Sequence, residues 1–271
     1  MHLSPIVLRS VGRSGTTMMM RILASHPKII ANEAYPLEFK AFVFSLYPEQ
    51  AFRSQTESER YSFTGDEDCL REPLRRNGRL TRSDVENVYA RLAGNSGKTP
   101  SFFAEKFPSW LPIDPSQADV VDLRTIVLHR DPRDVLLSAR AFDQKRGFRG
   151  FRERDGDSDE DVVVKYRDLY RAFLMDLERA RDPVIIRYED VLLAPVETVG
   201  RVFRELGVES DDATVTAALS RADALEDGRH RTTAGSSQSH GRWRTECPSA
   251  LRELFARHFT DLFPRLGYPL T

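Results

Sequence analysis

The sequence predicts a single α/β domain in which helices flank a mainly parallel central sheet. Short apolar runs rich in β-branched residues alternate with segments of helical periodicity, as in proteins with parallel sheets. A length of 271 residues suits one large domain or two small ones, and no clean linker or internal repeat divides the chain. The 40% of hydrophobic residues provides ample material for a core. We therefore expect one domain over residues 1–271.

The first three predicted elements are a strand, a turn and a helix. Residues 6–8 form an apolar run typical of a buried parallel strand. Gly12 and Gly15 mark a turn, and from Thr16 onward apolar residues recur at helical spacing. By the same criteria we expect strands at residues 29–31, 102–107, 124–129 and 183–190, and helices at 37–46, 83–92, from 132, at 162–180, 196–206, 212–219 and 248–262.

Two of these helices begin at capping signals. Ser83-Asp-Val-Glu86 has the pattern of a capping box, in which two side chains satisfy backbone N–H groups of the first turn. Asp131 is a good N-cap residue, and Pro132 suits the first helical position because it has no N–H to satisfy. We therefore expect the fourth strand to pass directly into a helix at Pro132.

The strand, turn and helix start of residues 5–23 together predict an anion site. Unpaired backbone N–H groups converge at such a turn, and the helix dipole favours negative charge. Ser14, Thr16 and Thr17 add hydroxyl donors, and Arg13 adds a permanent cation with several donors. We expect a phosphate or sulfate to bind here, although an ordinary strand-to-helix turn would have the same outline.

This turn differs from the P-loop of nucleoside triphosphatases. That motif has four residues between its glycines and then a lysine, whereas two residues separate Gly12 from Gly15 and Thr16 stands where the lysine would be. No second carboxylate strand for Mg²⁺ is evident, because residues 124–129 lead into Arg130-Asp131-Pro132. The sequence therefore does not favour Mg²⁺-dependent nucleotide hydrolysis.

The segment Gly12-Arg13-Ser14-Gly15-Thr16-Thr17 resembles the 5′-phosphosulfate loop of sulfotransferases that use 3′-phosphoadenosine 5′-phosphosulfate (PAPS). The resemblance extends over residues 5–243 and implies a P-loop-like, nucleotide-binding sulfotransferase fold. It implies that the donor PAPS and the product adenosine 3′,5′-bisphosphate (PAP) bind this loop, through Arg13, Ser14, Gly15, Thr16 and Thr17. It implies no metal, because arginine and the helix N-terminus supply the positive charge.

Arg130 and Ser138 form a second candidate anion site. Arg130 follows the predicted strand 124–129, at the end of a parallel strand where open α/β sheets bind ligands. Ser138 lies on the helix that follows, so an arginine and a hydroxyl are available to a second anionic group of the same ligand. The spacing resembles the 3′-phosphate motif of the same sulfotransferases. Taken alone, the pair would equally suit a surface arginine and a helix-surface serine.

Two later stretches resemble the rest of a nucleotide site. Tyr188 stands at a strand end, where its ring could stack on adenine or simply pack on the core. Residues 223–246 form a loop long enough to be functional or disordered, and in the family a late loop closes over the nucleotide. The match is weaker here, because residues 236–238 lack the Arg-Lys-Gly of cytosolic sulfotransferases. The donors that the resemblance implies in this loop are Ser237, Ser239 and Arg242.

The resemblance implies Glu33 as the general base for the acceptor hydroxyl. Cytosolic small-molecule sulfotransferases use a histidine in a Lys-Thr-His-like segment, where this chain has Lys106-Phe107-Pro108. Branches that act on protein tyrosine or carbohydrate use a glutamate shortly after the first helix, within a position or two of Glu33; Glu38 is the reserve. Alternatively, Glu33 is a surface carboxylate at a strand end with no catalytic role. Arg13 and the loop N–H groups would stabilise the charge that builds on the bridging oxygen.

Composition and charge limit the classes of partner and the cellular location that we expect. A formal net charge of −1 argues against a general nucleic-acid binder. Cys69 and Cys247 have neither metal-site spacing nor the pattern of a disulfide framework. No run approaches the ~20 apolar residues of a membrane span, and no signal peptide precedes the first strand. We therefore expect a soluble, cytoplasmic protein.

The acceptor is less constrained than the donor. Residues 35–80 and 142–160 are expected to shape its pocket, and their mixed charge and aromatic residues suit a hydroxyl on a small molecule, glycan, lipid or peptide. Two other functions stay open: a kinase-like transferase that uses Mg²⁺-ATP, and a catalytically degenerate nucleotide-binding protein of the same fold. The first would need Mg²⁺ and a lysine in the loop, and the sequence shows neither pattern.

Overall fold

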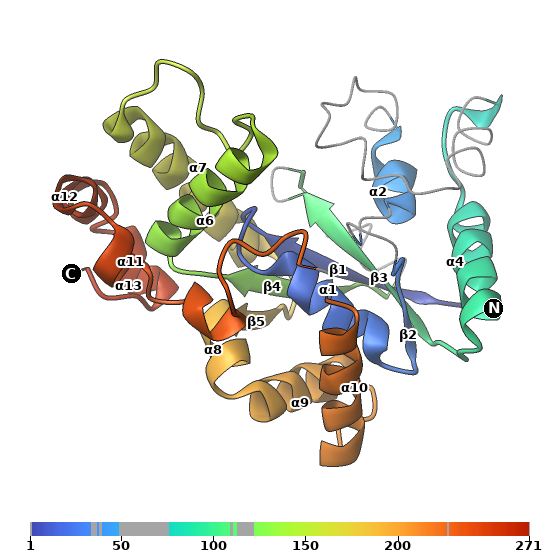
Figure 1. Cartoon of the computed structure of the whole chain (residues 1–271). Helices are drawn as coiled ribbons and strands as arrows, with labels where there is room; N and C mark the ends of the chain where they lie inside the picture. Colours follow the sequence, from blue (N-terminus) through green and yellow to red (C-terminus); the bar gives the residue numbers. More distant parts are fainter. Residues whose placement is uncertain are drawn as a thin grey trace.

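The computed structural model describes residues 2–33, 37, 40–48, 76–108, 111–112, 122–226 and 228–270, and only the backbone of residues 108, 236 and 237. A five-stranded sheet with the order β2-β3-β1-β4-β5 forms its centre, and every neighbouring pair of strands is parallel (Figure 1). The predicted fold class, α/β with a parallel central sheet, is confirmed. The strands are β1 (Ser4–Ser10), β2 (Ile29–Ile30), β3 (Phe102–Pro108), β4 (Arg124–His129) and β5 (Val184–Arg187).

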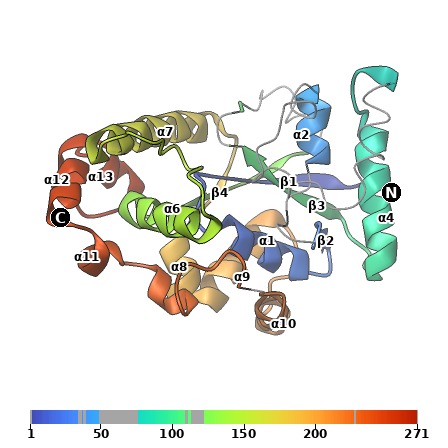
Figure 2. The same ribbon diagram turned by 45° about the horizontal axis from the view of Figure 1, so that its top comes forward.

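Helices cover both faces of the sheet. Figure 2 shows α6 and α7 side by side on one side of the sheet and α1 with α9 on the other. Among the described residues, no helix is both long and apolar enough to cross a membrane. The α-helices are α1 (Thr16–Ser25), α2 (Ala41–Leu46), α4 (Arg82–Ser96), α6 (Pro132–Arg146), α7 (Asp159–Arg179), α8 (Tyr188–Leu193), α9 (Pro195–Leu206), α10 (Asp212–Ala224), α11 (Trp243–Glu246), α12 (Ser249–His258) and α13 (Leu262–Leu266), and residues Ser236–Ser239 form a short 3₁₀ helix.

Alternate residues of the central strands enter different parts of the core, as the period of a strand requires. Ile6 and Leu8 of β1 pack with α1, α8, α9 and α10. Val7, between them, packs with α2 and α4, whereas Val127 of β4 packs with α6, α7 and α11–α13. Because the strands are buried on both faces, their apolar runs are nearly continuous.

Several predicted boundaries are confirmed by the structure. β4 has the predicted limits, and the Asp131 side chain caps α6 by accepting from the N–H of Arg133. Pro132 is the first residue of that helix, as expected. β4 therefore passes directly into α6, and this junction positions Arg130 and Ser138.

The predicted capping box at Ser83 and Glu86 is wrong. The N-cap of α4 is Thr81, whose hydroxyl accepts from the N–H of Asp84, while the Asp84 carboxylate accepts from the N–H of Thr81 at 2.8 Å. The chemistry is that of the predicted motif two residues earlier, because the shorter Asp84 can take the part of glutamate. The helix also continues to Ser96 and ends at Gly97.

Two other predicted elements are shorter than expected. The strand predicted over residues 183–190 ends at Arg187, because Tyr188 begins α8. Of the predicted last helix, residues 248–262, the structure has α12 over Ser249–His258, and Leu262 begins a separate helix, α13. In one continuous helix, Pro264 would offer no N–H to the carbonyl of Thr260 and its ring would collide with it. Of the predicted helix 37–46, residues 41–46 are helical.

Candidate functional site

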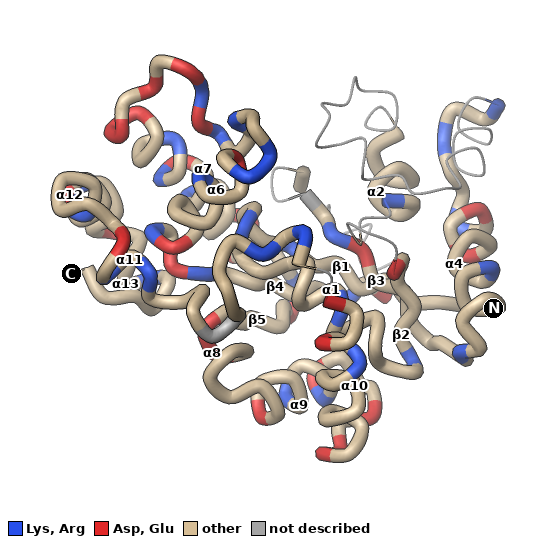
Figure 3. Tube along the Cα trace, viewed as in Figure 1, with Lys and Arg blue, Asp and Glu red and all other residues tan. Residues whose placement is uncertain are grey.

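The candidate site is a cavity of about 230 Å³ at the edge of the sheet where β1, β3, β4 and β5 end. Its lining includes the turn after β1, the ends of β3 and β4, helices α1, α6 and α8, Phe151 between α6 and α7, and several residues of the segment from Asp223 to Ser239. Figure 3 shows basic positions from the segment after β1 and from the segment between α10 and α11 close together above this edge. The lining has five basic side chains, Arg13, Arg21, Lys106, Arg130 and Arg231, and two acidic ones, Asp223 and Glu226. This excess of cations suits a ligand with several negative charges.

The turn between β1 and α1 has the geometry of an anion-binding loop. Gly15 is the N-cap of α1 at φ 94°, in the left-handed region, and Arg13 at φ 72° lies in that region without being glycine. A Cβ at Gly15 would overlap the ring of Tyr188, so only glycine fits both the backbone and this contact. The hydroxyl of Ser14 is buried and has no hydrogen-bond partner in the described structure. The predicted loop residues Gly15, Thr16 and Thr17 line the cavity.

Lys106 lines the cavity, although the sequence did not identify it as a candidate site residue. Its Nζ donates to Thr17 Oγ1 at 3.0 Å, and the residue is 8% exposed. β3 pairs with β1 with Lys106 opposite Leu8, which places the lysine beside the start of α1. Lys106 was visible on a predicted strand, but the register that brings it to Thr17 comes only from the paired strands.

Arg13 extends toward α6. Its Nε donates to Ser138 Oγ at 3.3 Å, and its Nη2 donates to the carbonyl of His230 at 2.8 Å. The guanidinium lies 4.1 Å from the centre of the Phe142 ring. The two predicted anion sites are therefore parts of one cavity, joined by the side chain of Arg13.

Arg130 is buried beneath the loop of residues 223–246. Its guanidinium donates to the carbonyl of Arg13 at 3.1 Å and to the carbonyl of Ser239, and it lies 4.6 Å from the Tyr188 ring centre. The Tyr188 hydroxyl and Ser239 Oγ are 2.5 Å apart. Arg130, Ser138, Tyr188 and Ser239, all predicted from sequence, thus line the same cavity as the loop.

Asp134 and Arg133, which follow Arg130 in the chain, connect the start of α6 to later segments of the chain. Asp134 accepts from the N–H groups of Gly241 (2.5 Å) and Trp243 (2.8 Å), which ties the end of the 223–246 loop to α6. Burial raises the pKa of Asp134, and the nearby Arg130 opposes that rise. The Cζ atom of Arg133 lies 3.5 Å from the ring centre of Trp243 and 4.4 Å from the ring centre of Phe263.

Arg242 lies outside the main cavity. It lines a neighbouring one of about 430 Å³ and binds Glu246 with Nη2–Oε2 at 2.6 Å, a hydrogen bond that lowers the pKa of Glu246. Its Nη1 is 3.5 Å from Thr232 Oγ1, and Thr232 lines both cavities. The side chain of Ser237 is outside the described residues.

Glu33 does not line the cavity. Its carboxylate binds Arg221 of α10 at 2.9 and 3.2 Å and lies 3.7 Å from Lys98. Burial lowers the pKa of Lys98, and Glu33 opposes that effect. The structure therefore places the predicted base in an ion-pair cluster. The reserve candidate, Glu38, lies outside the described residues.

A second missed feature is the ion pair between Arg21 and Glu226, which both line the cavity. Glu226 also accepts from the N–H of Gly228 at 2.8 Å. Burial is the largest single effect and opposes ionisation of Glu226, but the hydrogen bonds from Arg21 and Gly228 and the charges of Arg21 and Arg231 together outweigh it, so the pKa of Glu226 is lowered. Across the described ranges, no group of three or more His, Cys, Asp or Glu is placed to hold a metal ion.

Comparison with known proteins gives one family and one fold. Residues 5–212 match the model described as "Sulfotransferase family". The sulfotransferase domain of the curacin biosynthetic pathway has a similar fold, with a TM-score of 0.59 and 16% identity over 100% of this chain and 99% of its own. A sulfotransferase from Alicyclobacillus acidocaldarius has a TM-score of 0.54 and 18% identity, over 98% of this chain and 95% of its own. Mouse sulfotransferase SULT7A1, complexed with PAP, has a TM-score of 0.51 and 14% identity, over 96% of this chain and 84% of its own. No curated protein matches at a significant level.

Proposed function

The chain belongs to the sulfotransferase family, and from that premise we propose that it moves the sulfuryl group of PAPS to a hydroxyl of an acceptor. The observation that carries this proposal is one cavity with two groups of anion-binding side chains. Thr17 and Lys106 are at the helix start, and Arg130 and Ser138 are at the end of β4 and on α6. A nucleotide with anionic groups at both its 5′ and 3′ positions matches this arrangement, and the five cations of the lining favour its charge.

At the 5′ end, the residues of the turn would bind the phosphosulfate. The backbone N–H groups at the start of α1 and the hydroxyls of Thr16 and Thr17 donate to its oxygens. The bound donor supplies an activated sulfuryl group, whose S–O bond to the nucleotide breaks as a new S–O bond to the acceptor oxygen forms. Lys106, 3.0 Å from Thr17, and Arg13 stabilise the negative charge that builds on the bridging oxygen.

At the 3′ end, Arg130 and Ser138 would bind the phosphate. Arg130 is 3% exposed, so its charge-assisted hydrogen bonds are little weakened by water. Tyr188, packed on Gly15, would contact the base, and the loop over the cavity would contribute further donors. The donors of this loop are Ser237, Ser239 and Arg242, whereas Ser14 of the turn would donate to the phosphosulfate.

We propose that Glu33 takes the proton of the acceptor hydroxyl. Its carboxylate is ion-paired with Arg221 and near Lys98, so it must leave this cluster, or share it with the acceptor, to act as a base. The side chain is 31% exposed, which leaves it accessible to an acceptor. The proposed acceptor bears a hydroxyl and is a small molecule, glycan, lipid or peptide.

The proposal is tested by supplying radiolabelled PAPS, with EDTA present, to the protein and a panel of acceptors. The panel holds a sugar, a phenol, a fatty alcohol and a tyrosine peptide. We expect label to move to one class and PAP to appear in equal amount. Label transfer from ATP with Mg²⁺, and none from PAPS, would instead favour the kinase-like alternative. Tight PAP binding with no transfer to any class would favour the degenerate binding protein.

A further inference from the structure

Two aromatic rings cover the guanidinium of Arg13. Its Cζ lies 4.1 Å from the ring centre of Phe142 on α6 and 5.8 Å from that of Phe151, in the loop between α6 and α7. The edge of the same guanidinium makes hydrogen bonds to Ser138 and His230. Rings on a guanidinium face leave its in-plane donors available and fix its orientation.

We propose that Phe151 is a positioning residue, which holds Arg13 in the donor site, and that Asp143 and Tyr166 in turn hold Phe151. This inference rests on the proposed function, because Arg13 matters only if it contacts the donor. An arginine held in one orientation before binding loses less rotamer entropy when the ligand arrives. The clamp of Phe142 and Phe151 should therefore increase affinity for the nucleotide. Phe151 also lines the cavity, so its action through Arg13 is distinguished from a direct contact with the nucleotide by its dependence on Arg13.

Phe151 is fixed from three sides. Asp143 Oδ2 accepts from the N–H groups of Gly150 (2.9 Å) and Phe151 (3.4 Å). The hydroxyl of Tyr166, on α7, donates to the carbonyl of Phe151 at 3.2 Å. A Cβ at Gly12 would lie 3.2 Å from the Phe151 ring, so the ring packs directly on the turn after β1.

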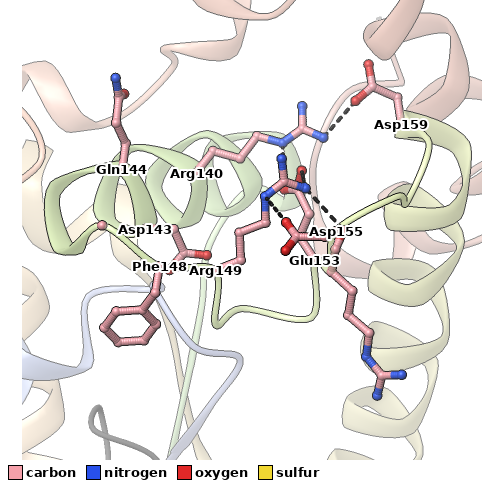
Figure 4. Close-up of a pocket in the computed structure, with 10 residues that line it drawn as sticks. Arg140, Asp143, Gln144, Phe148, Arg149, Glu153, Asp155 and Asp159 are labelled. Carbon is pink, nitrogen blue, oxygen red and sulfur yellow. Dashed lines mark hydrogen bonds and ion pairs between the residues drawn. The ribbon is translucent and has the colours of Figure 1, made fainter.

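The loop that carries Phe151 is shaped by ion pairs on its other side. Arg140 binds Glu153 at 2.9 Å and Asp159 at 2.7 Å, and Arg149 lies 3.4 Å from Glu153. Figure 4 shows Arg140 and Arg149 converging on these acidic side chains, whereas Phe148 points away from them. These side chains line a cavity of about 1020 Å³. Ion pairs within the loop and between the loop region and helices α6 and α7 thus support its conformation.

Phe148 provides a matched control for Phe151. It lies three positions earlier in the same loop and stacks on Arg146, at 4.1 Å, instead of on Arg13. Both rings are half-buried, so replacing either with leucine removes a comparable aromatic contact. Arg146 also lies 5.1 Å from the Phe151 ring centre and pairs with Asp143, so the two changes share this neighbour, but only the change at Phe151 removes a ring from Arg13.

The first test is calorimetry with PAP on the full chain. We expect Phe151→Leu to bind PAP about three- to tenfold more weakly than wild type, as loss of one cation–π contact implies. Phe151→Tyr should keep wild-type affinity because it keeps the ring, and Phe148→Leu should be unchanged. In an Arg13→Ala background, Phe151→Leu should cause no further loss. An equal loss with and without Arg13, or an equal loss in Phe148→Leu, would overturn the inference.

The second test needs no ligand and keeps the two proposals distinguishable. In ¹⁵N-arginine spectra, the Nε–Hε signal of Arg13, assigned by its disappearance in Arg13→Ala, should be shifted by the two rings. Phe151→Leu and Asp143→Ala should move it toward the position of exposed arginines, whereas Asp143→Asn, which keeps an acceptor for Gly150, should not. A signal that does not move overturns the clamp, whereas wild-type protein that shows the shift but binds no PAP overturns only the proposed function.

Discussion

Arg13 Nε donates to Ser138 Oγ across 3.3 Å, although 125 positions separate the two residues in the chain. One belongs to the turn after β1 and the other to the helix after β4. Because β1 and β4 are parallel neighbours, their carboxyl ends open into the same cavity. A bisphosphate nucleotide is therefore the ligand against which the site is best tested.

Lys106 should be required for turnover more than for binding. Loss of one preorganised donor at a centre of developing charge costs about 10²–10³-fold in rate. We expect Lys106→Ala to slow PAP formation from PAPS by about that factor, with a smaller effect on PAP affinity. Lys165→Ala is the control, since Lys165 pairs with Asp157 away from the cavity. Single-turnover kinetics measures the step, and a wild-type rate in Lys106→Ala would remove the proposed role.

Glu33→Gln tests the general base. The amide keeps the size of the side chain but cannot take a proton, so the chemical step should slow by about 10²–10⁴-fold. PAP affinity should be unchanged, because Glu33 does not line the nucleotide cavity. Glu178→Gln, at an exposed ion pair with Arg265, serves as the matched control. Unimpaired turnover in Glu33→Gln would assign the base to another residue.

Glu105 should make stability depend on pH. It is fully buried, accepts from the N–H groups of Phe42 and Val43 and the hydroxyl of Tyr89, and burial raises its pKa to about 7. The folded state therefore binds the proton more tightly than the unfolded state. The resulting stabilisation is fully present below about pH 4 and is lost as the pH rises to about 7, with a total of roughly 3 kcal/mol.

Urea unfolding of wild type and Glu105→Gln between pH 5 and pH 8 measures this effect. The wild type should lose roughly 1 kcal/mol per pH unit relative to the variant up to about pH 7, and nothing further above it. The variant is expected to be less stable overall, because its amide nitrogen must face a backbone N–H. Only the slope bears on the titration, and parallel pH curves would contradict it.

Arg133 should be essential for stability. It is 1% exposed, pairs with Asp131 at 2.8 Å, and donates to the carbonyls of Pro269 and Leu270 near the C-terminus. Removing one partner of a buried pair leaves the other charge uncompensated and costs about 3–5 kcal/mol, which is expected for Arg133→Ala in urea unfolding. Arg171→Ala, at an exposed pair with Asp261, should cost about 0–1 kcal/mol. Similar losses in the two variants would contradict this view of Arg133.

Local signals predicted much of the fold. The limits of β4 and the cap at Asp131 follow from a few adjacent residues, and the structure confirms them. The predicted position of the capping box of α4 was wrong, because two overlapping capping patterns occur at residues 81–86. In the structure Thr81 is the N-cap. The order of the strands could not be read from the chain, since nothing local to a strand identifies its neighbours.

The site was predicted in its residue types more than in its contacts. The structure brings Arg13, Arg130 and Ser138 together, because each follows or lies near a strand end. The ion pair between Glu33 and Arg221 joins residues 188 positions apart, and no sequence pattern links them. Contacts of this range depend on how helices pack on the sheet, which is decided by the whole core.

Recognition of a 3′-phosphate at Arg130 is best measured by calorimetric titration of wild type and Arg130→Ala with PAP and with 5′-AMP, in EDTA. We expect wild type to bind PAP at least about tenfold more tightly than 5′-AMP, as one charge-assisted contact to the 3′-phosphate requires. Arg130→Ala should lose most of this preference. Equal affinity of wild type for the two nucleotides, or binding only of ATP with Mg²⁺, would show that the cavity is not a PAPS site.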